Sequence, residues 1–173
     1  YGKALGNGFA ISAIVGKTEV MDSAQDTFIS STMWTERVGF VAGLATLNKL
    51  TKFKVHDHLA KIGTHIGDSW VHLAQKNGLN LSITEFKPCI TFKLNYGRDN
   101  NGIETLFIQE MLKRGYLAGT AVYVTFAHTI EIVDTYLLNV DEVFNIISNA
   151  IDNGIVMDLL DTEVRSDMFK RLT

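Results

Sequence analysis

Hydrophobic side chains recur every three or four residues along two long stretches of the chain, residues 55–76 and 129–153. This spacing predicts two amphipathic α-helices, each with one buried face. An Asn-Gly pair, Asn77-Gly78 or Asn153-Gly154, stands at the end of each stretch, and these residue types readily adopt the left-handed conformation that ends a helix. The two faces consist of Leu59, Ile62, Ile66, Trp70 and Leu73, and of Val133, Leu137, Val140, Phe144, Ile147 and Ile151.

Between the two helices the pattern changes to short apolar runs that are typical of strands. A helical face from Ile103 to Leu112 separates the second run from the third. The order strand, strand, helix, strand indicates an α+β fold, in which a small antiparallel sheet is covered on one face by the long helices. The predicted strands are residues 79–86, 89–94, 116–117 and 122–126.

The chain before residue 55 has a different pattern. The apolar run Phe9–Val15 is rich in β-branched residues and predicts a buried strand. Residues 36–50 have helical spacing, although Gly39 and Gly43 interrupt it. A glycine costs about 1 kcal/mol relative to alanine in a helix, so we expect these two to permit close packing. The polar residues 51–54 indicate a domain boundary.

The composition limits the classes of function. Of 173 residues, 46% are hydrophobic and 20% charged, which is typical of a folded core. A net charge of −3 without a basic patch argues against nucleic acid as a partner, and no apolar run is long enough to span a membrane. The single cysteine, Cys89, excludes an internal disulfide and fits a reducing cytoplasm. Because the chain begins at Tyr1 without a methionine, we expect a piece of a longer protein.

Lys3 is the first candidate for chemistry, since it lies among Gly2, Gly6 and Gly8 just before the apolar run. Glycines let the backbone turn sharply and let another group approach closely. A lysine that is held there and shielded from water can present a neutral amine, which forms a Schiff base with a carbonyl compound. The simpler interpretation is a solvated lysine in a turn.

The histidines are a second candidate, because His58, His65 and His72 are spaced seven residues apart on one predicted helix. Zinc ligands on a helix lie one turn apart, whereas this spacing separates the rings by two turns, roughly 10 Å. The three cannot share one metal ion. We therefore predict no metal site and expect a solvated helix face.

Three segments resemble class III pyridoxal-phosphate aminotransferases, and most closely the branch around glutamate-1-semialdehyde aminomutase. The likeness runs from residue 1 to about residue 150, with the segments in the family's order. The segments are Gly2-Lys3-Ala4-Leu5-Gly6-Asn7-Gly8-Phe9, then Ser31-Thr32-Met33-Trp34-Thr35, and then Ala127-His128-Thr129 with Asp134.

The resemblance implies roles for two residues and a division of the chain. Lys3 would be the catalytic lysine that holds pyridoxal 5′-phosphate as a Schiff base. Thr32 would bind the phosphate of the cofactor across the interface of a homodimer. Residues 1–50 would be a remnant of the large α/β cofactor domain of a fold type I transferase, and residues 51–173 its small C-terminal α+β domain.

The implied activity is amino-group transfer between a small-molecule amino donor and a carbonyl acceptor. The aminomutase branch has a glutamate in the loop before its Ala-His motif, whereas residues 118–126 contain no carboxylate. This difference favours an ordinary aminotransferase, with aminomutase activity as an alternative. A non-catalytic α+β interaction domain is the alternative from another class. The chain by itself is expected to be inactive, because it lacks the remainder of the cofactor site.

Overall fold

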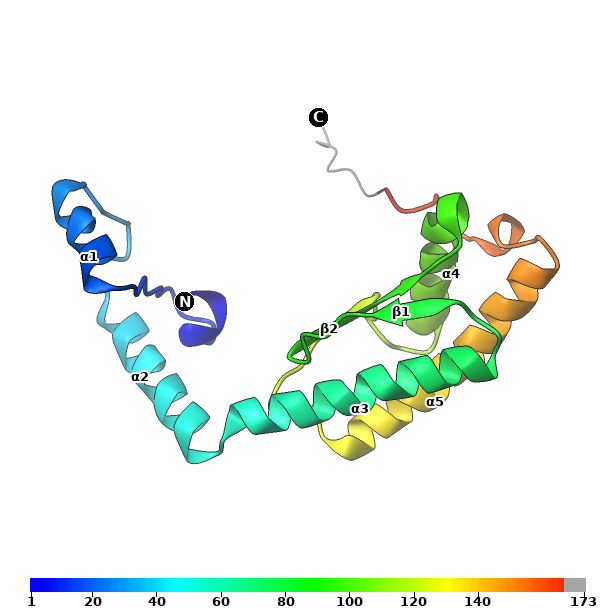
Figure 1. Ribbon diagram of the computed structural model, residues 1–173, viewed down its shortest axis with the longest axis horizontal. Helices are drawn as coiled ribbons and strands as arrows, with labels where there is room; N and C mark the ends of the chain where they lie inside the picture. The colour runs from blue at the N-terminus through cyan, green and yellow to red at the C-terminus, as the bar shows by residue number, and fades with distance from the viewer. Residues whose placement is uncertain (167–173) are drawn as a thin grey trace. The chain divides into compact units, whose positions relative to one another are not determined.

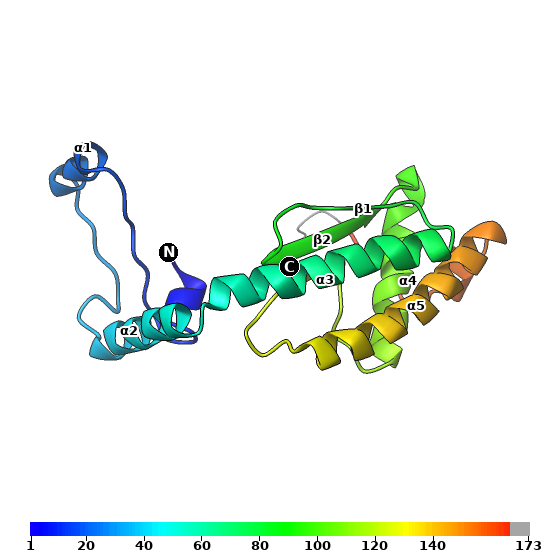
Figure 2. The same ribbon diagram turned by 60° about the horizontal axis from the view of Figure 1, so that its bottom comes forward.

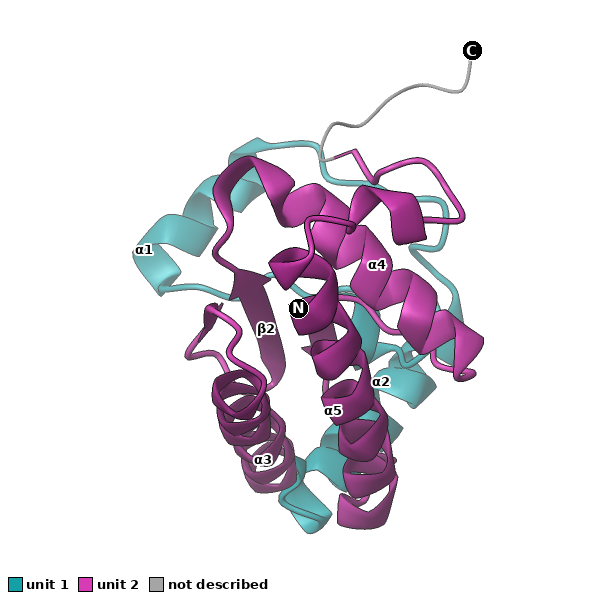
Figure 3. Ribbon diagram, turned by 90° about the vertical axis from the view of Figure 1, so that its right-hand side faces the viewer, with its two compact units in different colours: residues 1–55 teal, residues 56–173 magenta. Residues whose placement is uncertain are grey.

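The computed structural model describes residues 1–166 (Figure 1). The chain divides into two compact units, Tyr1–Val55 and His56–Thr173 (Figure 3). This division lies a few residues beyond the boundary expected at residue 50, because the helix α2 continues to Lys52. No helix in the described part of the chain is long and apolar enough to cross a membrane.

Unit 1 contains two helices and two short 3₁₀ turns. The expected strand at Phe9–Val15 is wrong: this segment is irregular, and the side chains of Phe9, Ile14 and Val15 are exposed. A strand needs a run of paired backbone groups, and in this segment the pairing with a neighbouring backbone is confined to Ala13, which exchanges hydrogen bonds of 2.6 and 2.7 Å with Tyr1. The elements of unit 1 are the 3₁₀ turn Lys3–Leu5, α1 (Thr18–Met21), the 3₁₀ turn Asp22–Asp26 and α2 (Arg37–Lys52).

The two glycines of α2 pack against the N-terminal turn, as their presence in a helix predicted. Gly39 and Gly43 are both buried. A Cβ atom on Gly39 would lie 2.5 Å from the carbonyl oxygen of Ala10, and one on Gly43 would lie 3.6 Å from the side chain of Ile11. The absence of a side chain at Gly39 therefore lets the segment around Ala10 lie directly on the helix.

Unit 2 confirms the expected α+β fold. Its three strands form an antiparallel sheet in the order β1-β2-β3, with Ser82 opposite Lys93 and Ile90 opposite Val122. The elements are α3 (Val55–Lys76, whose first residue belongs to unit 1), β1 (Leu81–Ile83), β2 (Cys89–Leu94), the 3₁₀ turn Gly97–Asp99, α4 (Asn100–Lys113), β3 (Ala121–Tyr123), α5 (Ile130–Asp152) and the 3₁₀ turn Met157–Leu159.

The expected strand at residues 116–117 is wrong because this segment ends α4 instead. Gly115 adopts a left-handed φ of 85°, and the amide of Tyr116 donates to the carbonyl oxygen of Met111 at 3.0 Å. These features are typical of a helix C-terminus closed by glycine. The Tyr116 amide therefore bonds to the last turn of α4 and is not available to pair with a strand.

The core of unit 2 forms where α3, α4 and α5 pack on one face of the sheet. In β2 the side chains of Ile90, Phe92 and Leu94 are buried, whereas that of Lys93 points to the other face and is exposed. The ring of Phe92 lies edge-on to those of Trp70, Phe107 and Phe144, with centroid distances of 4.9, 5.1 and 5.9 Å. Burial of each such aromatic side chain contributes about 2 kcal/mol or more.

The expectation of a solvated histidine face is wrong for two of the three residues. α3 and α5 run side by side (Figure 1 and Figure 2), and His65 Nε2 lies 2.7 Å from Asp134 Oδ1 of α5. His58 Nε2 donates to the carbonyl oxygen of His128 at 3.0 Å, just before α5. His72 remains exposed. Within residues 1–166, no group of three metal-ligating side chains is present.

Candidate functional site

Lys3 lies in a backbone conformation that is unusual for a residue with a side chain. Its φ is 40°, in the left-handed region, at the first position of the 3₁₀ turn Lys3–Leu5. The turn is closed by the Leu5 amide, which donates to the Gly2 carbonyl at 3.0 Å. Gly6 then brings the chain so close to Phe9 that a Cβ would lie 2.0 Å from the Phe9 carbonyl oxygen. The shape of this loop thus requires Gly6, and it also requires Gly8, whose φ is 107°.

Lys3 and Thr32 line the same hollow of unit 1, which has a volume of about 740 Å³. We call it the lysine hollow. The segment around residue 32 and the first turn of α2 form its other walls. Sequence reasoning assigned roles to Lys3 and Thr32 alone: Ser31 and Trp34 lie in the quoted segment around Thr32 without a role, and no motif marks Ser12, Glu36 or Phe40. The further lining residues include Ser12, Ser31, Trp34, Glu36 and Phe40.

The lysine hollow offers an amine, hydroxyl groups and aromatic rings. The carboxylate in the wall of the lysine hollow is that of Glu36. Glu36 is the N-cap of α2, and its side chain accepts a hydrogen bond from the Val38 amide at 3.4 Å. The expected shielding of Lys3 is wrong for the described chain: its side chain is exposed, because the residues that follow form no buried strand. Lys3 and the nearby hydroxyls fit the aldehyde and phosphate groups of pyridoxal phosphate. No lining residue supplies a free carboxylate for its ring nitrogen.

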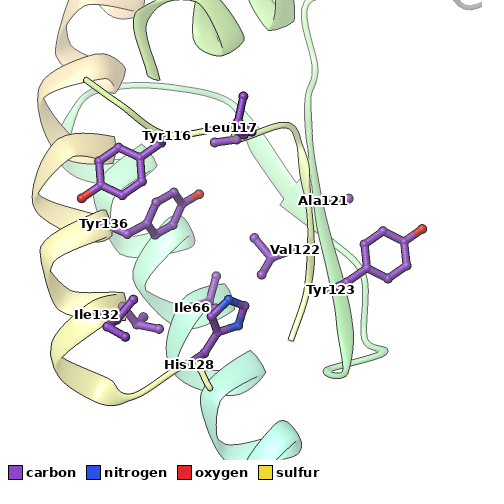
Figure 4. A pocket seen from close by; sticks show the side chains of 11 residues that line it. Ile66, Tyr116, Leu117, Ala121, Val122, Tyr123, His128, Ile132 and Tyr136 are labelled. Carbon is purple, nitrogen blue, oxygen red and sulfur yellow. The ribbon is translucent and has the colours of Figure 1, made fainter. Parts of the chain in front are cut away.

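A second hollow, of about 350 Å³, lies in unit 2 among the segment 116–123, α3 and α5 (Figure 4). We call it the aromatic hollow. Tyr136 lies in its wall and accepts a hydrogen bond from Trp70 Nε1 at 3.2 Å. Burial raises the pKa of the Tyr136 phenol above its ordinary value, which keeps the hydroxyl protonated.

His128 lines the aromatic hollow, but its contacts stabilise the start of α5. Its Nδ1 accepts from the Thr125 amide at 3.2 Å, and its carbonyl oxygen accepts from His58. The next residue, Thr129, caps α5 by accepting from the Ile132 amide at 3.3 Å. These contacts give His128 a structural role at the start of α5.

Comparison with known proteins relates most of the chain to aminotransferases. It is 30% identical over 139 residues to the 3-aminobutyryl-CoA aminotransferase of Cloacimonas acidaminovorans (strain Evry). This match covers 76% of this chain and 33% of that protein. It is 25% identical over 139 residues to the 2′-deamino-2′-hydroxyneamine transaminase of Streptomyces kanamyceticus, covering 78% of this chain and 35% of that protein. No protein-family model matches the sequence.

The fold has a counterpart of known structure. The FumI protein of Sphingopyxis sp. MTA144, solved in its PLP internal aldimine form, superposes with a TM-score of 0.77 at 23% identity. The match covers 87% of this chain and 37% of that one, and at this identity it shows the fold alone.

The chain spans about a third of the length of the curated relatives that it matches. Glutamate-1-semialdehyde 2,1-aminomutases are among those relatives. In sequence and fold, the chain corresponds to the C-terminal portion of the class III pyridoxal-phosphate-dependent aminotransferases and aminomutases.

Proposed function

We propose that this chain is the C-terminal part of a pyridoxal-phosphate-dependent aminotransferase. The observation that supports this most directly is the lysine hollow, where Lys3, held in a left-handed turn, and the hydroxyl of Thr32 line one space. Strained backbone positions are frequent at functional sites. The relatives are named for the same class of reaction.

In this proposal Lys3 has two tasks. Its amine would hold the aldehyde of pyridoxal phosphate, and its Nζ, when free and unprotonated, would accept the proton of the substrate α-carbon as a general base. The cofactor, when bound, supplies an electron sink for that carbon. Thr32 Oγ1 donates a hydrogen bond to a phosphate oxygen, and by the resemblance this cofactor belongs to the partner subunit of a homodimer.

The substrates are an amino donor and a carbonyl acceptor. One relative is named for 3-aminobutyryl-CoA and another for 2′-deamino-2′-hydroxyneamine, so the relatives of this chain are named for different substrates. We favour amino transfer over the aminomutase reaction because residues 118–126 carry no carboxylate. The single cysteine, Cys89, is free, which fits the cytoplasm that we propose for the enzyme.

The assignment of Lys3 is tested by borohydride reduction in the presence of pyridoxal phosphate, followed by peptide mapping. We expect the label on Lys3 in the longer protein of which we propose this chain is a part. Lys17 is the control, since it is the next lysine in the sequence and does not line the lysine hollow. Label on Lys17 with none on Lys3 would refute the proposal, and a fully unlabelled protein would favour the non-catalytic alternative.

A further inference from the structure

A third hollow, of about 560 Å³, lies in unit 2 where the end of β2 meets the start of α4. We call it the basic hollow. Thr91 and Lys93 reach it from the face of β2 opposite the buried Phe92 side chain, because side chains alternate along a strand. Arg98, from the turn before α4, also lines it. The remaining charged side chains in its wall are those of Glu104 and Arg165.

The cations of the basic hollow are only partly neutralised. Arg165 Nη1 donates to Glu104 Oε2 at 2.6 Å, and the Arg165 amide donates to Thr105 Oγ1 at 3.0 Å, so Arg165 is held in the wall. The side chains of Lys93 and Arg98 make no hydrogen bond or ion pair within residues 1–166. Among the described residues that line this space, three cations and one carboxylate leave two positive charges, in a chain whose net charge is −3.

Polar groups in the wall add hydrogen-bond donors to this charge. Asn100 Oδ1 accepts from the Tyr96 amide at 2.7 Å, which fixes the amide group and leaves its NH₂ available to donate. Thr120 adds a hydroxyl. The neighbouring Asp99 is not among the lining residues and faces a different hollow. Within residues 1–166, Glu104 is thus the one carboxylate that lines the basic hollow, and it is already paired with Arg165.

We propose that the basic hollow binds a dianionic phosphate group. A phosphate monoester carries a charge of about −1.5 to −2 at pH 7 and offers three acceptor oxygens, which matches two unpaired cations beside neutral donors. Arg98 supplies a planar pair of donors and Lys93 a point charge. The volume exceeds that of phosphate alone and lies within the range of small-molecule sites, so the space also accommodates an organic group attached to the phosphate.

Titration of the 173-residue chain, followed by amide NMR, tests the proposal with three probes: adenosine 5′-monophosphate, inorganic phosphate and adenosine. We expect the first two to shift the amides of residues 91–101 and 120 in a saturable way, and adenosine to leave them unchanged. Tighter binding of the monophosphate identifies an ester as the ligand, whereas equal binding identifies free phosphate. The same shifts with adenosine, or no saturable shift with either phosphate, would overturn the proposal.

Variants assign the effect to the basic hollow. Lys93→Ala and Arg98→Ala should each weaken phosphate binding about tenfold, the loss expected for one charge-assisted hydrogen bond. Glu104→Gln should strengthen it, which a folding defect could not do. Lys61→Ala is the matched control, because Lys61 is an exposed lysine of α3 outside the hollow. If Lys61→Ala weakened binding as much as Lys93→Ala, the phosphate would be a diffuse counterion. None of these probes involves Lys3 or Thr32, so this result is independent of the aminotransferase proposal.

Discussion

Gly39 and Gly43 lie one turn apart on the same face of α2 and both face Ile11, yet the space around them differs. A methyl group at Gly39 would lie 2.5 Å from a backbone oxygen, which cannot rotate away, whereas one at Gly43 would make ordinary contacts at 3.6 and 3.8 Å. We therefore expect Gly39→Ala to loosen the packing of α2 on the N-terminal turn. Gly43→Ala should gain about 1 kcal/mol of helix stability.

Hydrogen exchange of the α2 amides measures both effects in unit 1. The α2 amides should exchange faster in Gly39→Ala than in the wild type. In Gly43→Ala they should exchange about fivefold more slowly, which corresponds to about 1 kcal/mol in the free energy of opening the helix. Equal exchange in the two variants would show that the contact between Gly39 and Ala10 does not constrain the helix.

At the scale of elements, a buried hydrogen bond joins α3 to α5. Trp70 Nε1 donates to the hydroxyl of Tyr136 at 3.2 Å, and Trp70 is fully buried. Tyr136→Phe removes the acceptor and leaves a buried donor without a partner, so we expect a loss of about 1–3 kcal/mol in unfolding free energy. Urea denaturation measures this loss. Tyr123→Phe is the control, since the Tyr123 side chain is 75% exposed and its change should be near zero.

A second link between these helices, from Lys76 to Asp141, makes the free energy of unfolding depend on pH. A hydrogen bond from Lys76 lowers the pKa of Asp141 below its ordinary value, against the opposing effect of burial and with help from Asn77. A lowered carboxyl pKa stabilises the folded chain above the unfolded pKa, about 3.9 for Asp, and this contribution is lost as the pH falls through the folded value.

Asp141→Asn should therefore be less stable than the wild type near neutral pH, and the difference should shrink between roughly pH 5 and roughly pH 2. Urea denaturation across this range measures the difference. A difference that stays constant with pH would show that the charge of Asp141 contributes nothing to the link between α3 and α5.

At the scale of the whole molecule, the homodimer that we propose predicts a specific complementation. Lys3→Ala and Thr32→Ala each remove one part of the site. If Thr32 serves the partner's cofactor, a mixed dimer of the two variants of the longer protein regains one intact site and about half of the wild-type activity, because the lysine of one subunit meets the threonine of the other.

The mixed dimer is separated by two different affinity tags and assayed for amino transfer, with each variant homodimer as its control. If Thr32 instead serves the cofactor of its own subunit, the mixed dimer holds no intact site. Its activity would then not exceed half of that of the Thr32→Ala homodimer, and this outcome would contradict the shared site.

The sequence by itself determined the elements whose stability is local. The amphipathic period predicted α3 and α5, and the glycine of Asn153-Gly154 marked the end of α5, because these signals act within a few residues. The α+β order of unit 2 followed from them. The resemblance in the segment around Lys3 also required no tertiary information.

Only the tertiary structure decided which patterns became strands and which residues meet. Phe9–Val15 has the composition of a strand but no neighbouring strand within residues 1–55, and the residues before β3 are used to close α4. Thr32 reaches the hollow that Lys3 lines, and His65 pairs with Asp134 far along the chain. Such contacts depend on how distant segments pack, and the period or composition of a single segment contains no information about its partner.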